Sequence, residues 1–202
     1  MAAFPDLNRL ADSLWKGLRD PLARAVLVAS GAAAILIMCF VGWVAQPDRY
    51  VRGYGPAQPI PYSHKLHAGD MAIPCLHCHP GAERSRVAGI PSVEACLGCH
   101  RVTKAGSPAI KQLMAAFDSG QALHWKRVHS LPGYVFFDHR PHVNAGVACQ
   151  TCHGPVQDMA VLSQQMSLRM NNCLACHRNP RAALPAGSPI QRAPENCYAC
   201  HR

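Results

Sequence analysis

The motif Cys-x-x-Cys-His occurs five times in this chain, and no other feature constrains its fold as strongly. The two cysteines of such a motif lie on one face of a helical turn, where both can form thioethers to the vinyl groups of one porphyrin. The histidine that follows reaches the iron from the same side. We therefore predict five covalently attached c-type haems. The attachment cysteines are Cys75, Cys78, Cys96, Cys99, Cys149, Cys152, Cys173, Cys176, Cys197 and Cys200, and the proximal iron ligands are His79, His100, His153, His177 and His201.

Zinc sites or disulfides built from the same cysteine pairs are the alternative interpretation. Neither needs a histidine directly after the second cysteine, and all five pairs here have one. The pattern therefore favours haem.

Composition limits how the chain can build a core. Only 6% of its 202 residues are aromatic, whereas glycine and proline supply 15 and 17 positions. The five motifs leave too few residues around each for a conventional core. The porphyrin plates must then serve as the core, and covalent attachment orders the chain around them. We predict a mostly irregular fold with short α-helices packed on five haems, and one N-terminal transmembrane helix.

An uncharged run at residues 25–45 precedes the motifs. It is long enough to cross a hydrocarbon core of roughly 30 Å. It exceeds the apolar core of a typical signal peptide, and Trp43 stands where cleavage before Ala45 would need a small residue. We expect an uncleaved anchor, with a cleaved signal as the alternative. The N-terminus is predicted to stay in the cytoplasm, because basic residues precede the run, namely Arg9, Lys16, Arg19 and Arg24.

The chain is thus predicted to have three parts. Residues 1–21 form a cytoplasmic amphipathic segment, residues 22–46 a transmembrane anchor, and residues 47–202 a periplasmic pentahaem domain. We expect a single-pass protein of the inner (cytoplasmic) membrane. The amphipathic segment is inferred from apolar residues at helical spacing, which are Leu7, Leu10, Leu14, Trp15 and Leu18.

The formal charge of +9 does not indicate a nucleic-acid partner. Each ferric haem brings two propionates and a net charge of about −1, so five haems offset roughly half of the positive charge. The basic residues are therefore expected to neutralise propionates.

A short element with two histidines occurs twice, each time before an attachment motif. Tyr62-Ser63-His64-Lys65-Leu66-His67 precedes Cys75, and Phe137-Asp138-His139-Arg140-Pro141-His142 precedes Cys149. This repeat resembles the class III multihaem cytochromes c, in which the two histidines are distal ligands of two different haems. The resemblance implies that the distal ligands include His64, His67, His139 and His142.

A fifth distal ligand is needed if every iron has six ligands. His129 is the first candidate, because it lies between a predicted helix at residues 108–117 and the aromatic run at residues 134–137. His124 is the alternative, and a methionine thioether would raise the potential of its haem. The methionine candidates are Met170 and Met159. His77 lies inside the first attachment loop and is expected at the surface.

The resemblance extends to the pentahaem, membrane-anchored subunit of bacterial alternative complex III, a quinol oxidoreductase. It rests on residues 62–69 (YSHKLHAG), 124–143 (HWKRVHSLPGYVFFDHRPHV), 146–154 (GVACQTCHG), 173–180 (CLACHRNP) and the terminal NCYACHR. The VH-x-LP element within it supports His129. The resemblance implies an electron-transfer subunit that is not itself catalytic. It also implies partners: membrane subunits of the complex, a separate iron–sulfur subunit, and a monohaem cytochrome c or terminal oxidase.

Two other functions fit the sequence less well. A stand-alone tetrahaem quinol dehydrogenase would normally carry its first haem soon after the anchor, but here about thirty residues intervene. A multihaem reductase of nitrite or hydroxylamine would need an open iron position. No Cys-x-x-Cys-Lys motif is present, and the distal histidines suffice to fill the irons.

Overall fold

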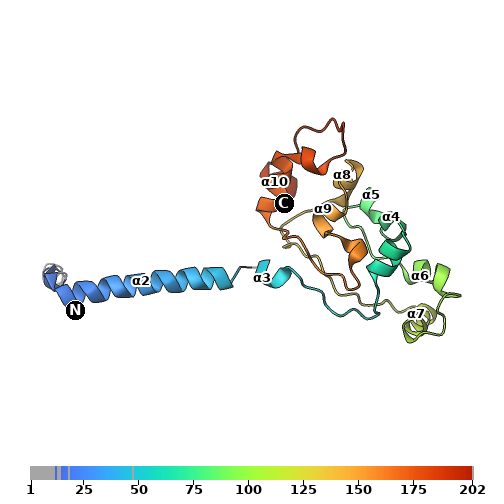
Figure 1. Cartoon of the computed structure of the whole chain (residues 1–202), viewed down its shortest axis with the longest axis horizontal. Helices are drawn as coiled ribbons and strands as arrows, with labels where there is room; N and C mark the ends of the chain where they lie inside the picture. Colours follow the sequence, from blue (N-terminus) through green and yellow to red (C-terminus); the bar gives the residue numbers. More distant parts are fainter. Residues whose placement is uncertain (1–11, 13–14, 18, 47, 202) are drawn as a thin grey trace, which may run out of the picture. The chain divides into compact units, whose positions relative to one another are not determined.

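The computed structural model describes residues 12, 15–17, 19–46 and 48–201. It divides into two compact units, Met1–Arg49 and Tyr50–Arg202. Figure 1 traces the chain from the long N-terminal helix to the haem-motif unit. Each unit is described by itself below.

The N-terminal unit is dominated by helix α2 (Pro21–Val44). Asp20 caps the helix by accepting a hydrogen bond from the Leu22 amide at 2.8 Å, and Pro21 occupies the first turn, where its missing N–H costs nothing. Twenty-four helical residues span about 36 Å, which is enough to cross a bilayer core.

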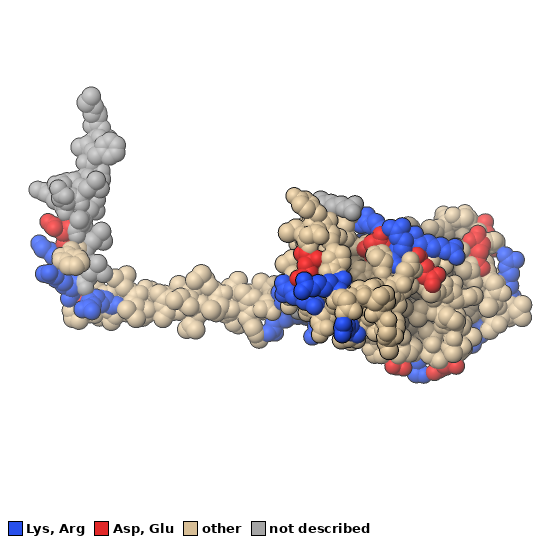
Figure 2. Space-filling view, turned by 90° about the horizontal axis from the view of Figure 1, so that it is seen from above, with Lys and Arg blue, Asp and Glu red and all other residues tan. Residues whose placement is uncertain are grey.

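Beyond Arg24 in its first turn, helix α2 carries no charged residue. Its most apolar window has a mean hydropathy of 2.4, and none of that window is buried within the protein. Figure 2 shows no charged side chain along the rod beyond its beginning. By length and composition this is the one membrane-spanning candidate in the described part of the chain. Near the N-terminus, such a helix is either a membrane anchor or a signal sequence.

Most of the predicted amphipathic segment falls outside the described residues, including Leu7, Leu10, Leu14 and Leu18. Trp15 is described and is exposed, with the Arg19 guanidinium 5.5 Å from its ring centroid.

The second unit consists of short helices joined by irregular chain. No helix in it exceeds twelve residues, and the described residues contain no strand, only an isolated bridge between Val135 and His201. In chain order, from the connection onward, the elements are α3 (Asp48–Val51), η1 (Lys65–Asp70), α4 (Cys75–Cys78), α5 (Gly81–Arg84), α6 (Val93–His100), α7 (Pro108–Ser119), α8 (His139–Asn144), α9 (Gln150–His153), η2 (Val156–Asp158), α10 (Met170–Arg178), η3 (Pro180–Ala183) and α11 (Cys197–Cys200).

Helix α7 follows its local signals. Ser107 caps its N-terminus by accepting from the Ile110 amide, and Gly120 ends it in the left-handed conformation at φ 67°. Its buried face carries Ile110 and Leu113, which pack with Leu97 of α6 and Ile60.

The protein core of this unit is small. Among the described residues, only six hydrophobic side chains are buried, namely Ile60, Ala82, Leu97, Ile110, Leu113 and Val128. A conventional domain of this length buries far more apolar surface. So small a core agrees with the prediction that porphyrins serve as the core of this unit.

Candidate haem-binding centres

All five attachment motifs form helical turns. They lie on α4, α6, α9, α10 and α11. In the first, third and fifth motifs the histidine amide donates to the carbonyl of the first cysteine, four residues back, at 2.8–3.0 Å. Both cysteines of a motif consequently share one side of a turn, as thioether attachment to one porphyrin requires.

None of the eleven cysteines is paired with another in a disulfide. Within the described ranges, no three or more His, Cys, Asp or Glu side chains gather in a way that could hold a metal ion. A haem iron needs only two protein ligands, because the porphyrin supplies the other four.

Three proximal histidines face a histidine of the repeated element. The ring centroids are 6.1 Å apart for His67 and His100, and 6.3 Å for His139 and His153. In the third pair, the ring centroids of His142 and His177 are 6.0 Å apart. A metal ion held about 2 Å from one nitrogen of each imidazole keeps the centroids roughly 6 Å apart. Each pair therefore has the spacing of two axial imidazoles on opposite sides of an iron.

Seven of the ten histidines predicted as iron ligands share a second feature that suits iron ligation. Each places Nδ1 within 2.5–3.3 Å of a backbone carbonyl oxygen. A carbonyl can only accept, so Nδ1 carries the proton and the Nε2 lone pair is free for a metal. The seven are His67, His79, His100, His139, His142, His177 and His201.

His64 is the remaining histidine of the repeated element. Its side chain is partly buried, and the largest effect of another residue on its pKa comes from His79. Its Nδ1 is buried with no hydrogen-bond partner among the described residues. Burial is the largest effect and lowers the pKa of His64 to about 4.

Burial favours the neutral form of three further histidine side chains, those of His153, His129 and His142. It lowers the pKa of His153 to about 4, with smaller contributions from neighbouring histidines. Burial also lowers the pKa values of His129 and His142. A neutral imidazole has the lone pair that a metal requires, so these rings are ready to ligate near pH 7.

Within the described part of the chain, the ring of the fifth proximal histidine, His201, contacts no histidine that is predicted as a distal ligand. Its ring stacks against Tyr134 at 5.9 Å. His129 instead lies beside His153, with ring centroids 4.4 Å apart, planes nearly perpendicular, and 3.3 Å between nitrogens. The predicted role of His129 as a distal ligand stays a prediction.

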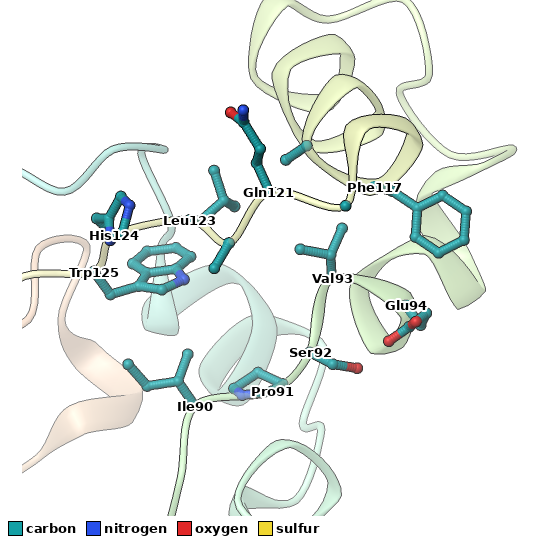
Figure 3. A pocket seen from close by; sticks show the side chains of 13 residues that line it. Ile90, Pro91, Ser92, Val93, Glu94, Phe117, Gln121, Leu123, His124 and Trp125 are labelled. Atoms are coloured by element: carbon teal, nitrogen blue, oxygen red, sulfur yellow. The ribbon is translucent and has the colours of Figure 1, made fainter.

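The other three candidates for the fifth position lie elsewhere. His124 is exposed at the edge of a cavity of about 580 Å³, next to Trp125 (Figure 3). Met170 is exposed at the start of α10, and Met159 is half-buried close to Gly154, which follows the third motif. His77 is exposed, as predicted.

The repeated element has the same geometry in both copies. Tyr62 stacks on His67 at 4.5 Å and meets His64 edge-on at 4.9 Å. In the second copy, the ring centroid of Phe137 lies 4.7 Å from that of His142. It meets the His139 ring edge-on at 4.8 Å. The aromatic residue therefore positions both histidines, which explains why it begins each copy.

Sequence reasoning missed Arg86. Its carbonyl oxygen accepts from His139 Nδ1 at 2.7 Å, and its guanidinium lies 4.7 Å from the Phe136 ring centroid. Its Nε also donates to the Phe137 carbonyl at 3.4 Å. Nothing in the local sequence marks a residue that acts on a histidine 53 positions away.

Comparison with known proteins agrees with this geometry. Residues 135–202 match the family model for cytochrome c7 and related cytochromes c. These residues, which hold the last three motifs, are similar to that family. A curated relative is 29% identical over an alignment of 178 positions, which covers 75% of this chain and 83% of the relative. That relative is the multihaem cytochrome c subunit of a menaquinone reductase from Nitratidesulfovibrio vulgaris (strain Hildenborough). The matched family and this relative are both cytochromes c, which agrees with the haem attachment predicted from the motifs.

Proposed function

We propose that this cytochrome is the electron-transfer subunit of a membrane quinol oxidoreductase of the alternative complex III type, with five haems c. The observation that carries the proposal is the opposition of proximal and distal imidazoles at about 6 Å. Two imidazoles per iron leave no position for a substrate, which favours electron relay over chemistry at the metal.

The residues fit the group that the motifs imply. Bound haem c supplies an iron that gains and loses one electron. The chain holds that iron through a proximal and a distal histidine. We propose His79 with His64, His100 with His67, His153 with His139, and His177 with His142. The distal partner of His201 stays open among His129, His124, Met159 and Met170.

The protein sets the properties of each site through hydrogen bonds and burial. Carbonyl acceptors fix the tautomer and the orientation of seven imidazoles and strengthen them as donors. Because these groups are already positioned, little reorganisation accompanies a change of iron charge. Such a site suits rapid, reversible electron transfer.

We further propose that α2 anchors the cytochrome in the inner membrane, with its N-terminus in the cytoplasm and the haem unit in the periplasm. The helix has the length and hydropathy of a membrane span. Partners would be polytopic quinol-binding subunits, an iron–sulfur subunit, and a monohaem cytochrome c or terminal oxidase that accepts the electrons.

A second direction of electron flow is supported by the curated relative, whose complex is named a menaquinone reductase. In that case electrons enter through the haems and leave to the quinone. The arrangement of ligands is compatible with either direction, because an electron relay has no intrinsic polarity apart from the potentials of its haems.

Purification of the intact complex from detergent-solubilised membranes tests the proposal. Co-purification of the full-length cytochrome with a polytopic quinone-binding subunit and an iron–sulfur subunit is the expected result. Quinol-driven haem reduction in that preparation supports alternative complex III. Haem-driven menaquinone reduction supports the second direction, and isolation of the cytochrome alone with full quinol activity would contradict both.

A further inference from the structure

The distal histidines of the first repeat bring the first and second attachment sites together. His64 and His67 lie one helical turn apart around η1, and Tyr62 touches both rings. Ile73, two residues before Cys75 of the first motif, donates to the His67 carbonyl at 3.0 Å, and the His67 ring faces that of His100 in the second motif. Ligands so close in one segment make the two sites neighbours.

The second repeat brings the third and fourth attachment sites together in the same way. His139 and His142 are on the single helix α8, and Phe137 touches both rings. His139 faces His153 of the third motif, whereas His142 faces His177 of the fourth.

The first and third sites are joined directly. Helix α5, which begins two residues after the first proximal histidine, packs against α8. The Arg86 carbonyl accepts from the His139 ring at 2.7 Å, and Asn144 donates to the Glu83 carbonyl at 3.4 Å.

The fourth and fifth sites are also adjacent. The His177 ring lies 2.5 Å from the Pro194 carbonyl, and Arg178 pairs with Glu195 at 3.1 Å. These partners immediately precede Asn196, which caps the helix of the fifth motif. The fifth motif therefore starts against the end of α10.

From these contacts we infer that the attachment sites follow one another in space in the order second, first, third, fourth, fifth, rather than in sequence order. The inference rests on the proposed electron-transfer function, because the spatial order of the sites would then be the order in which electrons pass between haems. Figure 1 shows the helices of the first four sites in this succession across the unit, from α6 through α4 and α9 to α10.

This order makes the second and fifth sites the two ends of the relay. Both ends present apolar or aromatic side chains to solvent. Val102, two residues after His100, is 87% exposed, and Tyr198 within the fifth motif is 82% exposed. The first, third and fourth sites lie between these two ends.

Locating the five irons in the haem-loaded, full-length protein by iron anomalous scattering tests the order. The iron on His79 should have the irons on His100 and His153 as its two nearest neighbours. The iron on His100 should have one near neighbour. If the iron on His153 is nearer to that on His100 than to that on His79, the order is wrong. This measurement does not depend on quinone activity, so it can fail independently of the proposed function.

Protein-film voltammetry adds a functional readout. In a Cys39→Ser background, Val102→Cys ties the second-site end to a gold electrode, and fast scans count the haems that exchange electrons. Removing the first haem by Cys75→Ala with Cys78→Ala should leave the second haem responsive and disconnect the other three. Removing the fifth by Cys197→Ala with Cys200→Ala is the matched control and should leave all four remaining haems responsive. Four responsive haems after removal of the first would overturn the order. If the first-haem variant does not fold, the iron positions decide.

Discussion

Replacing His139 by alanine tests the ligand pairing most directly. The His139 ring is parallel to that of His153 within 7°, and their centroids are 6.3 Å apart. The substitution removes one axial imidazole and leaves the other in place. We expect one haem of the five to change from low to high spin and to bind carbon monoxide.

The stability cost follows from the bonds that are lost. The ligand bond crosslinks positions 139 and 153 through the iron, and closing a loop of about that length is worth about 3 kcal/mol. The hydrogen bond to the Arg86 carbonyl, at 2.7 Å, adds about 0.5–1.5 kcal/mol. We therefore expect His139→Ala to lower the free energy of unfolding by about 4 kcal/mol, measured by denaturant titration of the full-length protein.

His77→Ala is the matched control for this experiment. His77 is an exposed histidine that we do not assign to any iron. Its replacement should leave the spin state, carbon monoxide reactivity and stability unchanged. If His139→Ala keeps every haem low-spin and unreactive to carbon monoxide, the pairing of His139 with His153 is wrong.

Three further predictions concern stoichiometry, packing and activity. Intact-mass spectrometry should show five haems with Cys39 unmodified, and a mass with four would show that one motif is not used. Gly69→Ala would drive a methyl group into the Gln157 carbonyl where η1 packs on η2, so it should cost about 1–3 kcal/mol in unfolding free energy; the control Gly106→Ala enters open space and should be neutral within about 0.5 kcal/mol. In liposomes, the purified chain should accept electrons from dithionite but not from quinol, because residues 25–45 contain no ionisable acid or base other than Cys39. Inhibitor-sensitive reduction by quinol without a partner would contradict that expectation.

Local chemistry made much of this protein predictable from its sequence. A motif that places two thiols and an imidazole within five residues fixes the attachment turn regardless of the surroundings, and all five motifs are helical. The boundaries of α7 also followed from short-range signals, because Ser107 caps one end and Gly120 adopts the left-handed conformation at the other. The repeated aromatic-and-histidine element was recognisable because its two copies match at short spacing.

Long-range packing decided the rest. The sequence indicated distal histidines but not their irons, since the pairing of His67 with His100 depends on how separate segments fold together. Arg86 and His139 meet across 53 positions, and His129 lies beside His153 rather than His201. The spatial order of the sites departs from chain order for the same reason. Sequence spacing determines geometry only within a turn or two of helix. The arrangement of the haem sites depends on contacts between distant segments, which no local pattern predicts.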